Sequence, residues 1–480
     1  MSELRKSLGT LQLLAFGVAG VVGASWIYTN STFFAAYGAG GVILGLCLGV
    51  ALAACVALAY ARLAQAFPRA GGEVVFSFAA LGRGPSFFTG WMLLGAYVSS
   101  LAFYVTAFGY LLGRFIPALD TLQLYTINGE TVYLPGLAIG VALTFAFFAL
   151  NWFGISVGAQ VQILMFALII LGGLALIVTG FTVGSPENFF PAFAPDASPL
   201  LDTLRFVVPG MTFLAGFGLV AVLAEDAKIS PRKIGLTVVW TVIVAGSFYV
   251  LVLLATAWVQ PWEEVAAMKL GTVDAFRAAG FPALSTVAYG IAVLGLLTSF
   301  LGLFVASSRI LVAMGRADLL PRRLAAVDER TGTPRTALVF TLVITLGLGW
   351  LGPGAVTWFL DTGGIYLGVV WIMVVIANLR LPASRVPRSL PATVLSVVGA
   401  VGALAVIVLA LWPGTGSSLV WPSEYLILLV WFVLGTILYA VSRRTDPQTS
   451  LRALLGHDLP DGEIPARRAA TAESNSGETR

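Results

Sequence analysis

Charged residues are scarce in this chain. Asp, Glu, Lys and Arg make up only 10% of its 480 residues, whereas 58% are hydrophobic and the mean hydropathy is +0.93. A water-soluble domain of this size cannot cover its surface with so few charges. The shortage therefore predicts an integral membrane protein surrounded by the lipid bilayer. The formal net charge is +4, but the sequence has no patch in which basic and aromatic residues alternate. No nucleic-acid partner is therefore expected.

Histidine and cysteine are also nearly absent. The one histidine, His457, lies in a polar C-terminal segment, which excludes imidazole as a proton carrier inside the membrane. Cys47 and Cys55 lie in a single apolar run, where neither a disulfide nor a metal centre is expected. No set of His, Cys and carboxylate residues converges within the apolar runs, so an enzyme is not expected either. Any proton coupling must then use carboxylates.

Long apolar runs recur along most of the chain. Since roughly 20 residues cross a bilayer as a helix, they predict about twelve transmembrane helices. The predicted spans are 11–36, 41–66, 86–113, 135–153, 157–182, 204–224, 235–258, 283–306, 336–351, 357–379, 391–412 and 422–441. Residues 1–442 thus form one transmembrane domain. Residues 443–480 are polar with little to bury, so a disordered cytoplasmic tail is expected there.

The basic residues predict the orientation. With the N-terminus on the cytoplasmic side, all but four of the 27 Lys and Arg residues fall in cytoplasmic connections, as the positive-inside rule requires. The four exceptions are Arg114, Arg205, Lys269 and Arg277. We therefore expect a multi-pass protein of the cell membrane, plasma or inner, with both termini cytoplasmic.

Two of the predicted helices are interrupted by small residues. One interruption is residues 17–25 (GVAGVVGAS), and the other is residues 213–218 (FLAGFG) in the sixth span. Non-helical backbone survives at membrane depth only where it is buried in protein or lines a cavity. Broken helices in corresponding positions of two halves indicate a transporter's binding site. The alternative is that these glycines only permit close helix packing.

Four motifs resemble the amino acid–polyamine–organocation (APC) superfamily of transporters, which includes the amino acid permeases. They are residues 23–25 (GAS), 67–73 (FPRAGGE), 224–234 (AEDAKISPRKI), and a fourth running through 308–314 (SRILVAM), 319–321 (LLP) and 332–334 (GTP). The resemblance implies an all-α leucine-transporter-type fold, a 5+5 inverted repeat with two broken helices that works by alternating access. Its repeats would cover about 11–182 and 204–380, with two extra helices at about 391–441.

The resemblance also implies where a substrate binds. A carboxylate would meet backbone N–H groups at the first break, and an amine would face carbonyls at the second. The two ends of a half-helix suit these opposite charges. The predicted substrate-binding residues are Val22, Gly23, Ala24, Ser25, Phe213, Leu214, Ala215, Phe217 and Gly218. Phe217 would be a hydrophobic wall or gate, or an ordinary packing residue.

The coupling group is less clear from the sequence. Many relatives have an acidic residue at the position of Gly218 and a lysine at that of Ile169, and this chain has neither. Asp361, near the start of the tenth span, is a candidate to take a proton or pair with a substrate amine. Alternatively, it caps that helix.

Three further carboxylates lie in predicted cytoplasmic loops. Glu73, Glu225 and Asp226 would form gate ion pairs, the latter two among Lys228, Arg232 and Lys233. The alternative is a solvated charge cluster of little energetic weight. Arg309 and Arg316 are interpreted mainly as positive-inside anchors.

A hydroxyl pair in the eighth span suggests a possible sodium site. Thr298 and Ser299 would bind the ion together with the carbonyls of Ala19 and Val22. The same hydroxyls would equally suit a bond to a carbonyl one turn back, or contacts between helices.

The sequence thus predicts a secondary transporter for an amino acid, small or apolar by preference, or a related amine. Proton symport or exchange is the leading mode, and sodium symport through Thr298 and Ser299 is the alternative. No cofactor beyond the coupling ion is expected. A transporter-like nutrient sensor without net transport is a rival of a different class, and an ion channel would need a continuous polar lining that these spans lack. The oligomeric state is not indicated.

Overall fold

The computed structural model describes residues 4–23, 25–113, 116–127, 130–352, 355–387, 389–412, 418–442 and 445–456. Within these ranges, ten helical segments are long and apolar enough to cross a membrane. They are α3 (Asn30–Ala66), α5 (Arg83–Gly113), α6 (Leu134–Trp152), α7 (Ile155–Val183), α8 (Pro199–Phe213) with α9 (Leu219–Val222), α10 (Pro231–Val259), α13 (Pro282–Arg316), α15 (Val356–Arg380), α16 (Leu390–Leu411) and α17 (Ser423–Val441). The chain is therefore an all-α multi-pass membrane protein.

Two predicted spans are shorter than these ten. The first contains α1 (Thr10–Val21), α2 (Ser25–Tyr28) and the start of α3 before its kink, and the ninth is α14 (Arg335–Gly349). The other short helices are α4 (Gly72–Leu81), α11 (Trp262–Ala266), α12 (Gly271–Ala278) and α18 (Pro447–Leu455), with the 3₁₀ turns η1 (Pro117–Leu119), η2 (Pro186–Asn188), η3 (Ala215–Gly218), η4 (Ala224–Asp226) and η5 (Arg322–Ala325). The count of twelve spans and the inverted repeat remain predictions.

A glycine kink separates the first two spans. Helix α3 begins at Asn30, but Gly38 interrupts it with φ 67° and ψ 166°, a conformation that favours glycine. Just beyond the kink, the N–H of Gly40 donates a hydrogen bond to the carbonyl of Ala192 (2.7 Å). The connection before α8 is thus held against α3.

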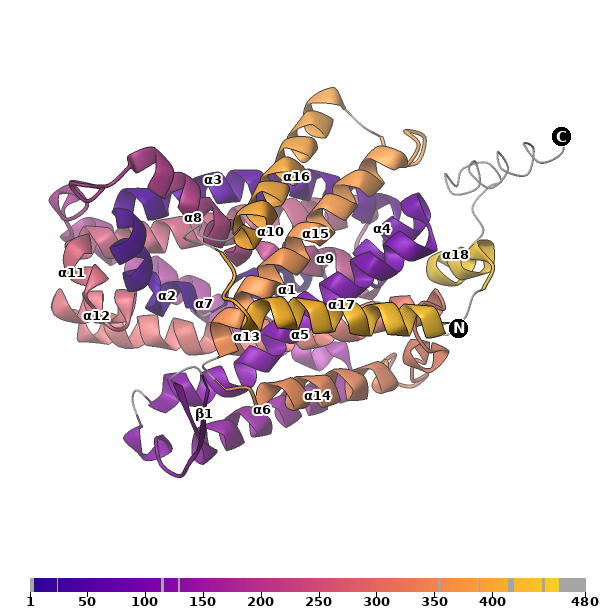
Figure 1. Cartoon of the computed structure of the whole chain (residues 1–480), viewed down its shortest axis with the longest axis horizontal. Helices are drawn as coiled ribbons and strands as arrows, with labels where there is room; N and C mark the ends of the chain where they lie inside the picture. The colour runs from indigo at the N-terminus through magenta and orange to yellow at the C-terminus, as the bar shows by residue number, and fades with distance from the viewer. Residues whose placement is uncertain are drawn as a thin grey trace.

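Burial separates central from peripheral helices. The apolar window of α5 is 94% buried within the protein, whereas that of α17 is only 11% buried. Figure 1 accordingly shows α16 and α17 on the outside of the bundle. Their exposed leucine and valine side chains form the apolar surface that a lipid-facing helix requires.

Two elements differ from the sequence prediction. An antiparallel hairpin, β1 (Gln123–Ile127) and β2 (Glu130–Tyr133), lies between α5 and α6. The predicted disordered tail is wrong for residues 447–455, which form α18. Its buried Leu451, Leu454 and Leu455 share one helical face and pack α18 against α4 and α13. Figure 1 places α18 and α4 at the same end of the bundle as the N-terminus, away from α11 and α12.

Candidate functional site

The first predicted interruption is a real break. Helix α1 ends at Val21, and the N–H of Gly23 donates to the Val21 carbonyl (2.9 Å). Two side chains support the non-helical backbone, since Trp26 Nε1 donates to the Gly23 carbonyl (2.7 Å) and the Tyr249 hydroxyl to the Val21 carbonyl (2.5 Å). Helix α2 then begins at Ser25, so a helix C-terminus and a helix N-terminus lie close together.

The second interruption is also a break. Helix α8 ends at Phe213, and the 3₁₀ turn η3 separates it from α9. The N–H of Leu214 donates to the carbonyl of Met211 (3.0 Å), the shorter i→i−3 pattern of a tightened turn. The regular i→i−4 ladder stops here, which leaves backbone carbonyls near the end of α8 available for other partners.

The two breaks cross in direct backbone contact. A Cβ atom built on Gly20 would lie 2.7 Å from the carbonyl oxygen of Gly216, and one on Gly216 would overlap the Gly20 carbonyl. Only glycine fits at either position. Close packing and broken helices, proposed from the sequence as alternatives, therefore occur together.

The predicted substrate residues line this crossing to different degrees. Phe217 is fully buried, and its ring centroid lies 5.0 Å from that of Tyr60 and 5.3 Å from that of Trp371. Leu214 and Gly218 are buried too, while Phe213 is half-buried. Ala24 lies outside the described residues, as do the side chains of Ser25 and Ala215. To bind a substrate carboxylate, the Gly23 N–H would have to leave the Val21 carbonyl.

The two candidate sodium-binding hydroxyls differ. Ser299 Oγ donates to the carbonyls of both Ala19 (2.6 Å) and Val22 (3.1 Å), the partners predicted from the sequence. Thr298 Oγ1 instead donates to Gly295 in its own helix (3.0 Å), which is the packing alternative. Sodium binding by these oxygens remains a prediction.

Four charged side chains form a buried cluster at the N-terminal end of the bundle, which we call the ion-pair cluster. Glu225 pairs with Arg316 (2.6 Å) and Asp226 with Arg309 (3.1 Å), and each of the four is at most 5% exposed. Glu225 also accepts the backbone N–H groups of Leu4 (3.0 Å) and Ala70 (3.1 Å). The cluster therefore joins the N-terminal segment, the start of α4, the end of the sixth span and α13.

The ion-pair cluster corrects two sequence interpretations. It is not a solvated surface cluster, and Lys228, Arg232 and Lys233, expected among its partners, are exposed. Arg309 and Arg316 are buried ion-pair partners and not free membrane anchors. They lie seven residues apart on one face of α13, which directs both toward the two acidic residues.

The pKa values of the two carboxyl groups in the ion-pair cluster are shifted in opposite directions. Burial tends to raise the pKa of Glu225, but the hydrogen bond and charge of Arg316, with the two N–H donors, bring this pKa below its ordinary value. For Asp226, burial outweighs Arg309, so its pKa lies above the ordinary value. Glu225 is thus the more firmly ionised of the two.

Glu73 does not form the predicted gate ion pair. Its side chain, at the start of α4, is fully buried beside the Tyr60 hydroxyl of α3, with which it hydrogen-bonds, and it has no cationic partner among the described residues. It points to the second break, because a Cβ on Gly218 would overlap Glu73 Oε1. The sequence places this residue in a loop, and only the adjacent Gly71 and Gly72 hint at close docking.

Asp361 lies within α15 and its side chain is exposed. The N-cap of that helix is Ala355, so the capping alternative is wrong. The Asp361 carboxyl group interacts with that of Glu424, a buried residue in the first turn of α17. No local sequence signal indicates this pair of carboxyl groups, because the two residues lie far apart in the chain.

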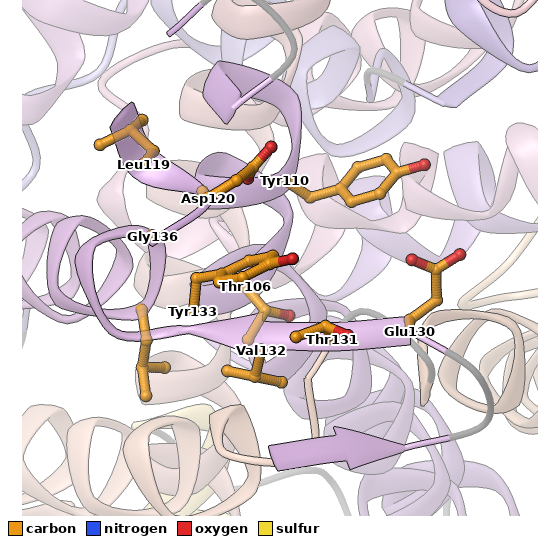
Figure 2. A pocket seen from close by; sticks show the side chains of 11 residues that line it. Thr106, Tyr110, Leu119, Asp120, Glu130, Thr131, Val132, Tyr133 and Gly136 are labelled. Carbon is orange, nitrogen blue, oxygen red and sulfur yellow. The ribbon is translucent and has the colours of Figure 1, made fainter. Parts of the chain in front are cut away.

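A polar pocket of about 230 Å³ lies apart from the breaks, between α5, the hairpin and α6. Figure 2 shows Asp120 and Tyr110 on one side of it and Thr131 and Glu130, from β2, on the other. Asp120 and Glu130 are exposed. The pocket therefore belongs to the surface around the hairpin.

The fold and the site together define a class: an all-α multi-pass membrane protein built around two broken helices that cross at glycines. The chain belongs to the amino acid permease family, since the family model described as "Amino acid permease" matches residues 8–434. The resemblance to the APC superfamily is thereby confirmed.

Similar proteins that match most of the chain include two named for their substrates and one uncharacterized transporter. The branched-chain amino acid permease BcaP of Lactococcus lactis is 26% identical over 452 residues, which cover 90% of this chain and 93% of the relative. The human cationic amino acid transporter 4 is 27% identical over 404 residues, covering 81% and 62%. The uncharacterized transporter Rv1999c of Mycobacterium tuberculosis is 28% identical over 346 residues, covering 71% and 73%.

Proposed function

We propose that this protein is a secondary transporter that carries an amino acid across the cell membrane by alternating access, coupled to protons as symport or exchange. The crossing of the two broken helices at Gly20 and Gly216 carries this proposal. Broken helices at the centre of a bundle present backbone donors and acceptors to a substrate without exposing unpaired groups to lipid. Membership of the amino acid permease family supports the same conclusion.

Aromatic rings and hydroxyl groups around the breaks favour a small or apolar amino acid. The rings of Trp26, Phe213 and Tyr249 contact one another there, and Tyr104 and Ser299 bring hydroxyls next to Gly23. Such a lining suits an apolar side chain, with the charged ends of the substrate bound by backbone groups. One relative is named for branched-chain and another for cationic amino acids, so both classes belong in the test.

The ion-pair cluster supports the proposal that one end of the bundle is closed and that this end faces the cytoplasm. We infer that the end carrying Leu4 and the cluster faces the cytoplasm, because the basic residues of the chain gather on that side under the positive-inside rule. In this arrangement the cluster closes the cytoplasmic end. The substrate would then leave for the cytoplasm only after these ion pairs part.

Uptake into proteoliposomes tests the proposal. With an inward proton gradient, we expect labelled apolar amino acids to accumulate above equilibrium, and collapse of the gradient with a protonophore to leave only exchange. Accumulation or exchange of neither amino acids nor amines under any gradient would contradict transport. Specific binding of a substrate without exchange would instead favour the nutrient sensor.

Replacing sodium with choline tests the alternative coupling ion. We expect unchanged uptake, because Ser299 already bonds the two carbonyls directly and Thr298 bonds its own helix. Ser299→Ala should lower uptake several-fold by freeing the Ala19 and Val22 carbonyls, while Thr298→Val serves as the matched control. A sodium requirement that both substitutions remove would establish the sodium site instead.

A further inference from the structure

We propose that Glu73 carries the coupled proton: it holds the proton while the N-terminal end of the bundle is closed and releases it to water when that end opens. This inference rests on the proposed transport function and names the group that links it to protons. It differs from the sequence-based interpretation, in which Asp361 is the candidate for this role and Glu73 belongs to a gate.

Two glycines bring Glu73 to the second break. Gly71 has φ 77°, and a Cβ on Gly72 would lie 2.7 Å from the backbone of Ala221 in α9. The start of α4 therefore docks directly on the sixth span. The carboxyl group then occupies the space beside Gly218 that a side chain would otherwise fill.

Among the residues that the structure describes, no cationic side chain forms an ion pair with Glu73. The titratable groups facing it within the described residues are the hydroxyls of Tyr60 on α3 and Tyr97 on α5. The nearby arginines of α13 are bound to the acidic residues of the ion-pair cluster, and α15 brings the uncharged ring of Trp371 against Phe217. Helix α18 carries Arg452, but the side chain of Arg452 is exposed whereas that of Glu73 is fully buried. An ionised carboxylate that has the Tyr60 hydroxyl but no cation beside it is disfavoured in such a place. The closed arrangement therefore favours the neutral acid.

The space beside the Glu73 carboxyl group is too small for a ligand larger than a proton. Its side chain is fully buried, and not even a methyl group fits between Oε1 and Gly218. A substrate amine or a hydrated cation has no room there in this conformation. A proton on the carboxyl group needs no additional space.

Hydroxyl groups on α5 connect Glu73 with the first break. Tyr104 lies beside Gly23 and Ser299, and Tyr97 lies two turns away toward Glu73. The rise of a helix puts these two residues about 10 Å apart. The Tyr97 hydroxyl has no hydrogen-bond partner within the described residues, so it is available to a water molecule or to the carboxyl group.

The segment before Glu73 links proton release to opening. The N–H of Ala70 donates to Glu225 in the ion-pair cluster (3.1 Å), and the N–H of Gly71 donates to the Val222 carbonyl (3.1 Å). When these bonds part, water reaches Glu73. The carboxyl O–H bond then breaks, the proton passes to water, and the carboxylate that remains is hydrated. Reprotonation before closure reverses the step.

Glu73→Gln tests the proposal in proteoliposomes, since the amide has the shape of the neutral acid but cannot release a proton. We expect accumulation driven by a proton gradient to fall at least tenfold, while exchange of labelled for unlabelled substrate persists and shows that the variant is folded. Glu424→Gln is the matched control, because it also places an amide at a buried carboxyl position.

Each outcome of this comparison either supports or contradicts the role of Glu73 as the proton carrier. Gradient-driven accumulation by Glu73→Gln at the wild-type level overturns the proposal, and so does an equal loss in Glu424→Gln. Loss in Asp361→Asn but not in Glu73→Gln moves the role to Asp361. If the wild type exchanges substrate without using a proton gradient, this inference fails and transport stands. If the wild type neither accumulates nor exchanges substrate, the proposed function itself fails.

Tyr97→Phe supplies a second test should Glu73→Gln not reach the membrane. Its hydroxyl lacks a partner in the described structure, so its removal should cost the fold little. When the N-terminal end opens, this unpaired hydroxyl becomes a donor to the Glu73 carboxylate. Without it the carboxylate is less well stabilised, and the pH midpoint of uptake should shift upward by at least half a unit. An unchanged midpoint would contradict the placement of the proton on Glu73.

Discussion

Gly216→Ala is expected to abolish transport. The added Cβ would overlap the carbonyl group of Gly20, and backbone cannot move aside as a flexible side chain can. Overpacking of a close-packed interior typically costs about 1–3 kcal/mol. The cost of forcing two crossed helices apart should lie at or above the upper end of that range. We expect at least a tenfold loss of exchange and a lower unfolding temperature in detergent.

Gly290→Ala is the matched control for this substitution. Gly290 also lies in a membrane-spanning helix, α13, but an added Cβ there has no atom within 4 Å in the described structure. Helix propensity then slightly favours alanine, by about 0.5–1 kcal/mol. Exchange at the wild-type level in both variants would show that the two breaks do not touch in the working protein.

Arg309→Leu is expected to destabilise the closed protein strongly. It leaves Asp226 buried without its guanidinium partner, and removal of one member of a buried ion pair typically costs about 3–5 kcal/mol. We expect a large drop in unfolding temperature and greater labelling of a cysteine introduced at Leu8, which is buried in the closed state.

Two further variants distinguish the effect of losing the buried ion pair from a general effect of removing an arginine. Arg335→Leu removes a partly exposed ion pair with Asp328 and should change stability little. The double variant Arg309→Leu with Asp226→Leu removes both charges, so it should regain much of the lost stability. A double variant as unstable as Arg309→Leu alone would contradict this account of the ion-pair cluster.

Local sequence patterns are sufficient to predict the broken helices and most helix positions. A run such as residues 235–258 is mainly apolar and has no charged residue, and lipid permits only regular helix there, as α10 confirms. The small residues at 17–25 and 213–218 likewise predict both breaks. Helix ends are less certain, because α13 continues ten residues past the expected 306 through Arg309 and Arg316. Their ion pairs offset the cost of burying these charges.

Contacts between distant segments cannot be predicted in the same way. Glu73 looks like a loop residue from its neighbours, and its burial depends on Gly218, far away in the sequence, having no side chain. Arg309 resembles a membrane anchor until Asp226 is seen beside it. The hairpin follows α5 without a sufficiently apolar alternation to indicate it, since most of β1 is exposed.

The glycine crossing also constrains how the protein moves. Because Gly20 and Gly216 touch through their backbones, sliding one helix along the other would bring Phe16, one turn before Gly20 on the same helical face, against the partner helix. Rotation about the contact avoids this clash, so the crossing acts as a pivot. The ten residues from Gly20 back to Thr10 form a lever of about 15 Å, and a swing of about 20° would move its far end by about 5 Å. That displacement exceeds the diameter of a water molecule, so a small turn at two glycines would be enough to let water into the N-terminal end of the bundle.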